Sequence, residues 1–266
     1  LKDPGAIYSG TIDNTDRAIE RLLEKLKAMG LEKDTLVVYS SDNGSYRKDR
    51  VGELRETKGS NCEGGIRVPG IFSWPGKIPA RRVSHEPAGQ IDILPTVCGL
   101  LDLKPPKGVH LDGADLSPVL LGMRDSITRQ QSLAWILPLS GSPIALRDGK
   151  WSLIGRRSGD FPRDREAMSK LMGQMEKLLE EKGDPNPKTT VRAKLFEGFD
   201  DRDLERIRGQ YIRHNQFQES WIPAIKTMRF DRFELYDLSK DLGQKTDVAK
   251  SNPEVFEKLK RQLLAI

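Results

Sequence analysis

Apolar residues near the start of the chain recur with the spacing of an amphipathic helix over residues 12–30. Gly30 is the expected end of this helix. Its apolar stripe consists of Ile12, Ile19, Leu22, Leu23, Leu26 and Met29. Short, nearly all-apolar runs at 35–40 and 68–74 then predict two strands. Such strands are typical of parallel sheets covered on both faces. We therefore expect residues 1–125 to form part of an α/β domain, with a mixed, mainly parallel sheet sandwiched by helices.

The pattern changes after residue 125. Apolar runs at 144–146 and 151–154 flank Arg147-Asp148-Gly149-Lys150, which is a hairpin signal. A further strand is expected at 230–238, and a terminal helix begins near Pro253. Residues 126–266 are therefore predicted to form a small α+β C-terminal subdomain with an antiparallel sheet.

A charged insert is expected within that subdomain, at about 161–229. It contains an amphipathic helix around 168–179 and a second, highly charged helix around 200–211, joined by a linker rich in Pro and Asp at 183–188. No internal repeat or low-complexity segment is present.

The most informative stretch for chemistry runs from Ser40 to Pro69. Asp42 and Asn43 follow the first predicted strand directly, where Asp-Asn-Gly is also a common turn sequence. As ligands, a carboxylate and an amide oxygen suit a hard divalent cation. Lys58 stands in Thr57-Lys58-Gly59, where the glycine permits close approach and the lysine can bind an anion. The alternative for Lys58 is an ordinary solvated loop lysine.

Several motifs in this region resemble the second half of the sulfatase signature of the alkaline-phosphatase-like superfamily. They occur in the order TLVVYSSDNG, LRETKGSNCEGGIRVPG, WPGKIP, IDILPTVCGLL and LDGADLSPVLLG. The resemblance covers residues 8–122, and the tail FELYDLSKDLGQKTDVAKSNPEVFEKL is also similar to the end of such proteins. Six pieces in order are far more specific than one Asp-Asn-Gly turn.

The resemblance implies that Asp42 and Asn43 are metal ligands, for Ca²⁺ or for Mg²⁺, and that Lys58 contacts the substrate sulfate as a catalytic and binding residue. Arg55 matches a frequently basic place, where it either holds the loop or binds the leaving group. The family nucleophile is a formylglycine made from Cys-x-Pro-x-Arg or Ser-x-Pro-x-Arg, and neither pattern occurs in the 266 residues. The chain therefore resembles the C-terminal half of a sulfatase, and we expect the nucleophile and the other metal ligands on an N-terminal half.

The implied activity is that of a sulfuric ester hydrolase of the arylsulfatase type, acting on a small-molecule or carbohydrate sulfate ester. The chain alone, which lacks the nucleophile, is expected to be inactive. Two alternatives stay open: a phosphoester or phosphonate hydrolase of the same superfamily, and a non-catalytic fragment that acts as a binding module. Because many relatives are exported, the resemblance favours a periplasmic or secreted location, which nothing else in the sequence indicates.

Composition and net charge give little information on binding partners. The 44 basic and 39 acidic residues give a net charge of +5, which is consistent with a mixed, solvated surface. No Lys/Arg block with interleaved aromatic residues is present, so nucleic-acid binding is not expected. No apolar run approaches the roughly 20 residues that span a bilayer. Cys62 and Cys98 are the two cysteines. Cys98 has the pattern of a core residue, and a disulfide between the two stays open.

Overall fold

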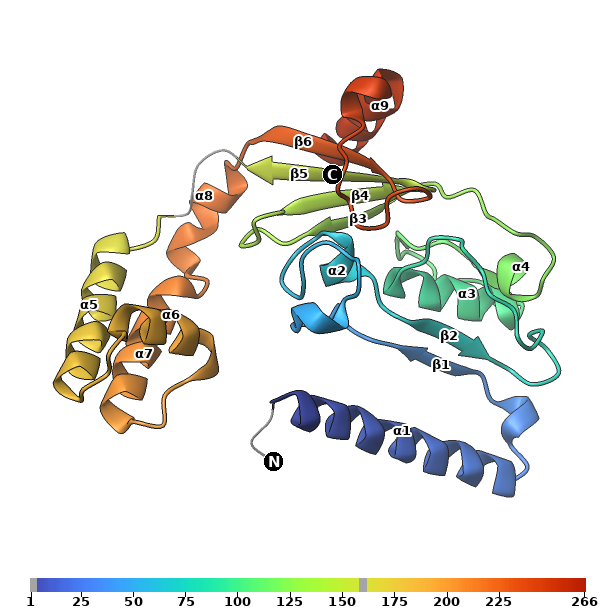
Figure 1. The fold of residues 1–266 in the computed structure, drawn as a ribbon. Coiled ribbons are helices and arrows are strands. Elements are labelled where there is room, and N and C mark those ends of the chain that lie inside the picture. The colour runs from blue at the N-terminus through green and yellow to red at the C-terminus, as the bar shows by residue number, and fades with distance from the viewer. Residues whose placement is uncertain (1–3, 158–161) are drawn as a thin grey trace. The chain divides into compact units, whose positions relative to one another are not determined.

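The computed structural model describes residues 4–157 and 162–266. They form two compact units (Figure 1): the first comprises residues up to Ile154 together with Glu234–Ile266, and the second comprises Gly155–Phe233. We call the second the helical unit. The insert expected at 161–229 lies inside it, whereas the hairpin that was expected to open the C-terminal subdomain begins in the first unit.

The first unit begins with the long helix α1 (Pro4–Ala28), which contains most of the predicted 12–30 helix. Its apolar stripe is largely exposed, with Leu22 at 59% and Ile12 at 55%. The strands β1 (Val37–Ser40) and β2 (Gly70–Ser73) follow, and they pair antiparallel with Val37 opposite Ser73. The parallel pairing expected here is not among the described strand pairs and stays a prediction. Tyr39 of β1 is 40% exposed, so this strand is less covered than its sequence suggested.

Two short helices complete this part of the first unit: α3 (Ile93–Leu100) and α4 (Ser117–Leu120). The connection between them is held by Asp92, which is buried. Its carboxylate accepts hydrogen bonds from the Ala114 and Gly89 backbone N–H groups, both at 2.7 Å, and forms an ion pair with Arg129 at 2.6 Å. The buried carboxylate is thus paired and hydrogen-bonded, as burial of a charge requires.

A four-stranded sheet has the strand order β3-β4-β5-β6. Its strands are β3 (Leu133–Ile136), β4 (Ile144–Asp148), β5 (Trp151–Arg157) and β6 (Phe230–Asp237). β3 and β4 pair antiparallel, and the predicted hairpin joins β4 to β5 through Gly149, whose φ of +54° is in the left-handed region that favours glycine. The terminal helix α9 (Pro253–Leu264) packs against β4. The predicted α+β character of this region is confirmed, although β3 was not foreseen.

The helical unit contains α5 (Arg165–Glu181), α6 (Pro187–Glu197), α7 (Arg202–Asn215) and α8 (Ile222–Lys226). α5 contains the helix expected around 168–179, and α7 contains most of the helix expected around 200–211. The core of the unit is apolar and consists of Leu171, Met175, Leu179, Val191, Leu195, Leu204 and Ile207. α5 and α7 are amphipathic by their own sequence, so these two helices follow from local periodicity, whereas α6 has only a weak apolar pattern.

Candidate functional site

Asp42 and Asn43 lie two and three residues beyond the last residue of β1. Asp42 is exposed and Asn43 is half-buried, and the Asn43 amide donates a hydrogen bond to the Asp42 carboxylate. The side chain of Gln90 reaches this segment and donates to the Ser41 carbonyl at 2.9 Å. The two predicted ligands therefore lie side by side at the end of a strand, with carboxylate oxygen accessible from solvent.

In the loop from Asp42 to Arg67, three glycines let distant parts of the backbone pack directly against each other. A Cβ atom at Gly44 would lie 2.0 Å from the Gly64 carbonyl oxygen, and one at Gly64 would lie 2.2 Å from that of Glu56. At Gly65 a Cβ atom would lie 2.1 Å from the Ser60 carbonyl oxygen. No side chain fits at such distances, so close packing of the loop explains why glycine is needed at these three positions.

The backbone of Lys58 is hydrogen-bonded to the segment that follows Asp42 and Asn43. Its N–H donates to the Ser45 carbonyl at 2.9 Å, and the Gly44 N–H donates to the Gly65 carbonyl at 2.8 Å. Gly59, directly after the lysine, has a φ of +87°, which turns the chain back. The Lys58 side chain is exposed, and the structure gives its ammonium no hydrogen-bond or ion-pair partner among the described residues.

The loop is anchored in the interior of the first unit by the residues around α2 (Glu63–Ile66). The Asn61 N–H donates to the Ser142 hydroxyl at 3.0 Å, and the Glu63 N–H donates to the Gln244 side-chain oxygen at 2.8 Å. Cys62 is fully buried in a cluster with Ala145, Ile154, Tyr236 and Leu238. Burial raises the pKa of the Cys62 thiol, with the nearby Glu56 carboxylate adding to the effect. A buried, protonated thiol suits a core residue rather than a nucleophile.

Arg55 is also tied to the sheet. Its guanidinium forms an ion pair with Glu234 at 3.0 Å, donates to the Tyr236 hydroxyl, and lies 5.5 Å from the centre of the Tyr236 ring. The pKa of Tyr236 is raised above its usual range, mainly by burial and next by the hydrogen bond to Glu234. The hydroxyl therefore stays protonated. These contacts favour the loop-holding role of Arg55 over contact with a leaving group.

Sequence patterns did not indicate the residues that hold the loop. No motif surrounds Ser142, and the family-like tail that contains Glu234, Tyr236 and Gln244 does not indicate that these side chains hold the loop. The loop residues they contact are 81 positions away for Ser142, 179 for Glu234 and 181 for Gln244. Only the folded chain brings them together, because no periodicity connects such distant positions.

The donor set fits part of a hard-metal site. Asp42 and Asn43 supply a carboxylate and an amide oxygen, whereas Ca²⁺ takes six to eight oxygen ligands. In residues 4–157 and 162–266, the His, Cys, Asp and Glu side chains form no group of three or more that could hold a metal ion. The two residues could therefore hold a cation only together with further ligands.

In the part of the chain that the structure describes, no helix has the length and apolarity needed to cross a bilayer. Both cysteines are buried and free.

Part of the chain is similar to sulfatases. Residues 6–103 match the family model described as Sulfatase. Human arylsulfatase A is 41% identical over 120 residues, covering 43% of this chain and 23% of the relative. Mouse steryl-sulfatase is 36% identical over 125 residues, covering 43% and 20%. The chain thus spans about a fifth of the length of these curated relatives.

Solved structures of other proteins share the fold of this chain. The crystal structure of Ps i-CgsB aligns with all of this chain and with 44% of its own, with a TM-score of 0.64 and 20% identity. The same protein in complex with k-i-k-neocarrahexaose gives a TM-score of 0.58 over 97% of this chain and 42% of its own, also at 20% identity. Through the family match of residues 6–103 and this shared fold, the chain is identified as similar to the C-terminal part of a sulfatase.

Proposed function

We propose that the protein to which this chain belongs hydrolyses sulfate esters, and that the loop from Asp42 to Lys58 contributes the metal and sulfate contacts. One observation carries the proposal: the backbone hydrogen bonds from Gly44 to Gly65 and from Lys58 to Ser45 join the segment of Asp42 and Asn43 to the segment of Lys58. In this proposal residues 1–125 are the C-terminal part of the catalytic domain, and residues 126–266 are the smaller subdomain.

Each residue has a separate role in the proposed reaction. Asp42 and Asn43 hold a divalent cation, Ca²⁺ or Mg²⁺, which supplies Lewis-acid polarisation of the sulfate group when bound. Lys58 offsets negative charge on the sulfate oxygens as the S–O bond of the leaving alcohol breaks, because its ammonium is a compact and mobile donor. Arg55 positions the loop through Glu234 and Tyr236. The nucleophile, a formylglycine, comes from outside these 266 residues.

The proposed substrate is a sulfated carbohydrate or small molecule. Among the proteins of the same fold, one was solved with a bound neocarrahexaose, and this supports the carbohydrate alternative. The composition of the loop does not select between a sugar and an aryl alcohol.

The test uses the protein with the preceding segment that carries the nucleophile. Sulfate release from an aryl sulfate and phosphate release from the matching aryl phosphate are measured side by side, with and without chelator. We expect faster release of sulfate, loss of activity on chelation, and recovery with Ca²⁺ or Mg²⁺. Asp42→Ala should shift the metal concentration for half-maximal activity upward, whereas Asp112→Ala, at an exposed loop position outside the site, should not.

Two outcomes would replace the proposal. Preferred release of phosphate would favour the phosphoester or phosphonate hydrolase of the same superfamily. Absence of both activities in protein that contains the nucleophile would favour the binding module.

A further inference from the structure

The helical unit contains an open groove whose lining lies outside its apolar core. The contact between Lys182 and Asp201, at 2.7 Å, joins the end of α5 to the start of α7, so the two helices run antiparallel. Their shared core uses Leu171, Met175 and Leu179 of α5. The neighbouring face of α5 is left to line an open groove with α7.

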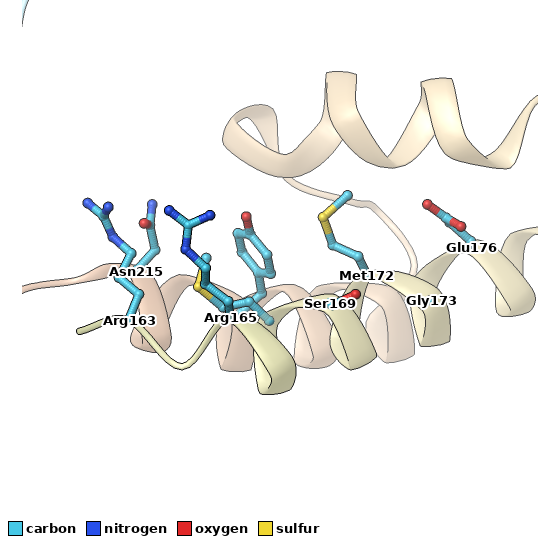
Figure 2. Close-up of a pocket in the computed structure, with 9 residues that line it drawn as sticks. Arg163, Arg165, Ser169, Met172, Gly173, Glu176 and Asn215 are labelled. Carbon is cyan, nitrogen blue, oxygen red and sulfur yellow. The ribbon is translucent and has the colours of Figure 1, made fainter. Parts of the chain in front are cut away.

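The groove has a volume of about 570 Å³, which is within the range of roughly 300–1,000 Å³ for small-ligand sites. The lining of the groove includes Arg163, Arg165, Met172, Gly173, Tyr211 and Asn215. Figure 2 shows Arg163, Arg165 and Asn215 together at one end, Glu176 at the other, and Met172 between them. A Cβ atom built at Gly173 meets nothing within 4 Å, so the groove is open at this position.

The two arginines lie at the N-terminal end of α5. They flank Asp164, the N-cap of α5, whose carboxylate accepts from the Ala167 N–H at 2.8 Å. Because the helix dipole is positive at this end, cations here are disfavoured and acids are preferred. Two guanidinium groups at such a position, both lining a groove, are the arrangement expected for binding an anion.

The groove is also partly preorganised. The Arg163 guanidinium lies 5.6 Å from the ring centre of Trp221, which is buried. Tyr211 and Met172 pack against the core of the unit, so their groove-facing atoms are held in place. Ligands of small sites are typically held by apolar walls with a few fixed polar groups, and holding such groups in advance lowers the cost of binding.

We propose that the groove between α5 and α7 is a non-catalytic binding site for a sulfated oligosaccharide. The arginines bind a sulfate group, Tyr211 and Met172 lie against the apolar face of a sugar ring, and Asn215 and Glu176 bind hydroxyl groups. An acidic peptide helix suits the groove less, because such helices need a continuous apolar channel and this one alternates apolar and polar groups. The choice of a sulfated sugar rests on the proposed function, whereas the anion site rests on the groove itself.

The test is calorimetric titration of the intact chain with a heparin-derived hexasaccharide and with its desulfated counterpart. We expect binding of the sulfated sugar only. Arg165→Gln should weaken it about tenfold or more, as expected for loss of a charge-assisted hydrogen bond. Arg192→Gln removes the same charge from an exposed position on α6 outside the groove and should leave the affinity within about twofold.

A second variant distinguishes loss of binding from loss of folding. Gly173→Gln fills the groove while raising helix propensity, so binding should be lost with no loss of thermal stability. Gly10→Gln, at an equally open glycine of α1, is the matched control and should bind normally.

Four results would overturn the proposal: equal weakening by Arg165→Gln and Arg192→Gln, equal binding of the desulfated sugar, no binding to the unaltered chain, or competition by an acidic amphipathic peptide that binds more tightly. Lys58→Ala separates the two proposals. In protein that carries the nucleophile it should lower sulfate-ester turnover about 100- to 1,000-fold, and it should leave hexasaccharide binding to the groove unchanged. Loss of that binding would place the sugar at the Lys58 loop instead.

Discussion

The loop from Asp42 to Arg67 and the helical unit are stabilised in different ways. The loop has almost no regular structure and depends on residues 81 to 181 positions away, such as Ser142 and Gln244. The core of the helical unit is built mainly by the amphipathic helices α5 and α7, which pack with α6 close to them in sequence. The conformation of the proposed reaction site therefore depends on tertiary contacts, and the helical unit is specified largely by local pattern.

The largest effect is expected at the buried ion pair of the first unit. Asp92→Ala leaves the Arg129 guanidinium without its carboxylate partner, and breaking a buried ion pair costs about 3–5 kcal/mol. Hydrogen exchange measured by peptide should therefore show lost protection at 87–129 and unchanged protection in α5 and α7. Equal loss in the helical unit would contradict the separation of the two regions. Asp241→Ala, at a carboxylate that accepts only exposed local backbone hydrogen bonds, is the control and should cost less.

The same pair gives a pH dependence. Burial alone would raise the pKa of Asp92, but the hydrogen bond from Arg129 and those from the Ala114 and Gly89 N–H groups outweigh it and lower the pKa. The stability that Asp92 contributes is therefore fully present above its unfolded pKa of about 3.9 and is lost as the pH falls through the lower folded value. Asp92→Asn should flatten this acid limb in a urea-unfolding series below pH 4. An unchanged limb would show that other carboxylates control it.

A pair of glycines compares the two regions directly. Gly64→Ala places a Cβ atom 2.2 Å from the Glu56 carbonyl oxygen and should destabilise the first unit by about 1–3 kcal/mol. Gly173→Ala in α5 meets nothing within 4 Å and should stabilise the helical unit by about 0.5–1 kcal/mol. Urea unfolding of both variants measures the difference. Effects of the same sign would refute the contrast between a packed loop and an open helix face.

Arg55 tests whether anchoring and substrate contact can be separated. Arg55→Gln removes the ion pair with Glu234 and the stacking on Tyr236. Because about a quarter of this pair is exposed, at 27% for each side chain, we expect a loss of about 1 kcal/mol. Differential scanning calorimetry gives the loss, and an unchanged KM for an aryl sulfate would support anchoring. A raised KM with unchanged stability would instead indicate that Arg55 contacts the substrate.

The smallest effect is expected at a local contact of the helical unit. The hydrogen bonds from Arg208 and from the Phe199 N–H lower the pKa of Glu205 to about 2. Its contribution is thus present above the unfolded value of about 4.3 and is lost as the pH falls toward 2. Glu205→Gln should shift the unfolding midpoint of the helical unit slightly at pH 5 and not at pH 2. An equal shift at both pH values would exclude this ion pair as the cause.

These two regions also show what the sequence could predict. The helices around 168–179 and 200–211 are evident because their apolar residues repeat with a helical period, and the tail helix is marked by Pro253. Asp42, Asn43 and Lys58 could be proposed because they occupy contiguous motifs. The contacts of Arg55 with Glu234 and of Cys62 with Tyr236 could not, since tertiary packing joins segments with no shared pattern. For the same reason α6, whose apolar pattern is weak, was missed.

Lys58 gives the most direct test of the central claim, that this loop binds the sulfate group. Its exposed side chain should matter little to folding, so Lys58→Ala should change the free energy of unfolding by less than about 0.5 kcal/mol. Turnover of an aryl sulfate at saturating Ca²⁺, by protein that carries the nucleophile, should fall about 100- to 1,000-fold, and Lys58→Arg should rescue it poorly. If Lys58→Ala retains more than about a tenth of the turnover, a deficit under about 1.4 kcal/mol, then Lys58 is an ordinary loop lysine and the site lies elsewhere.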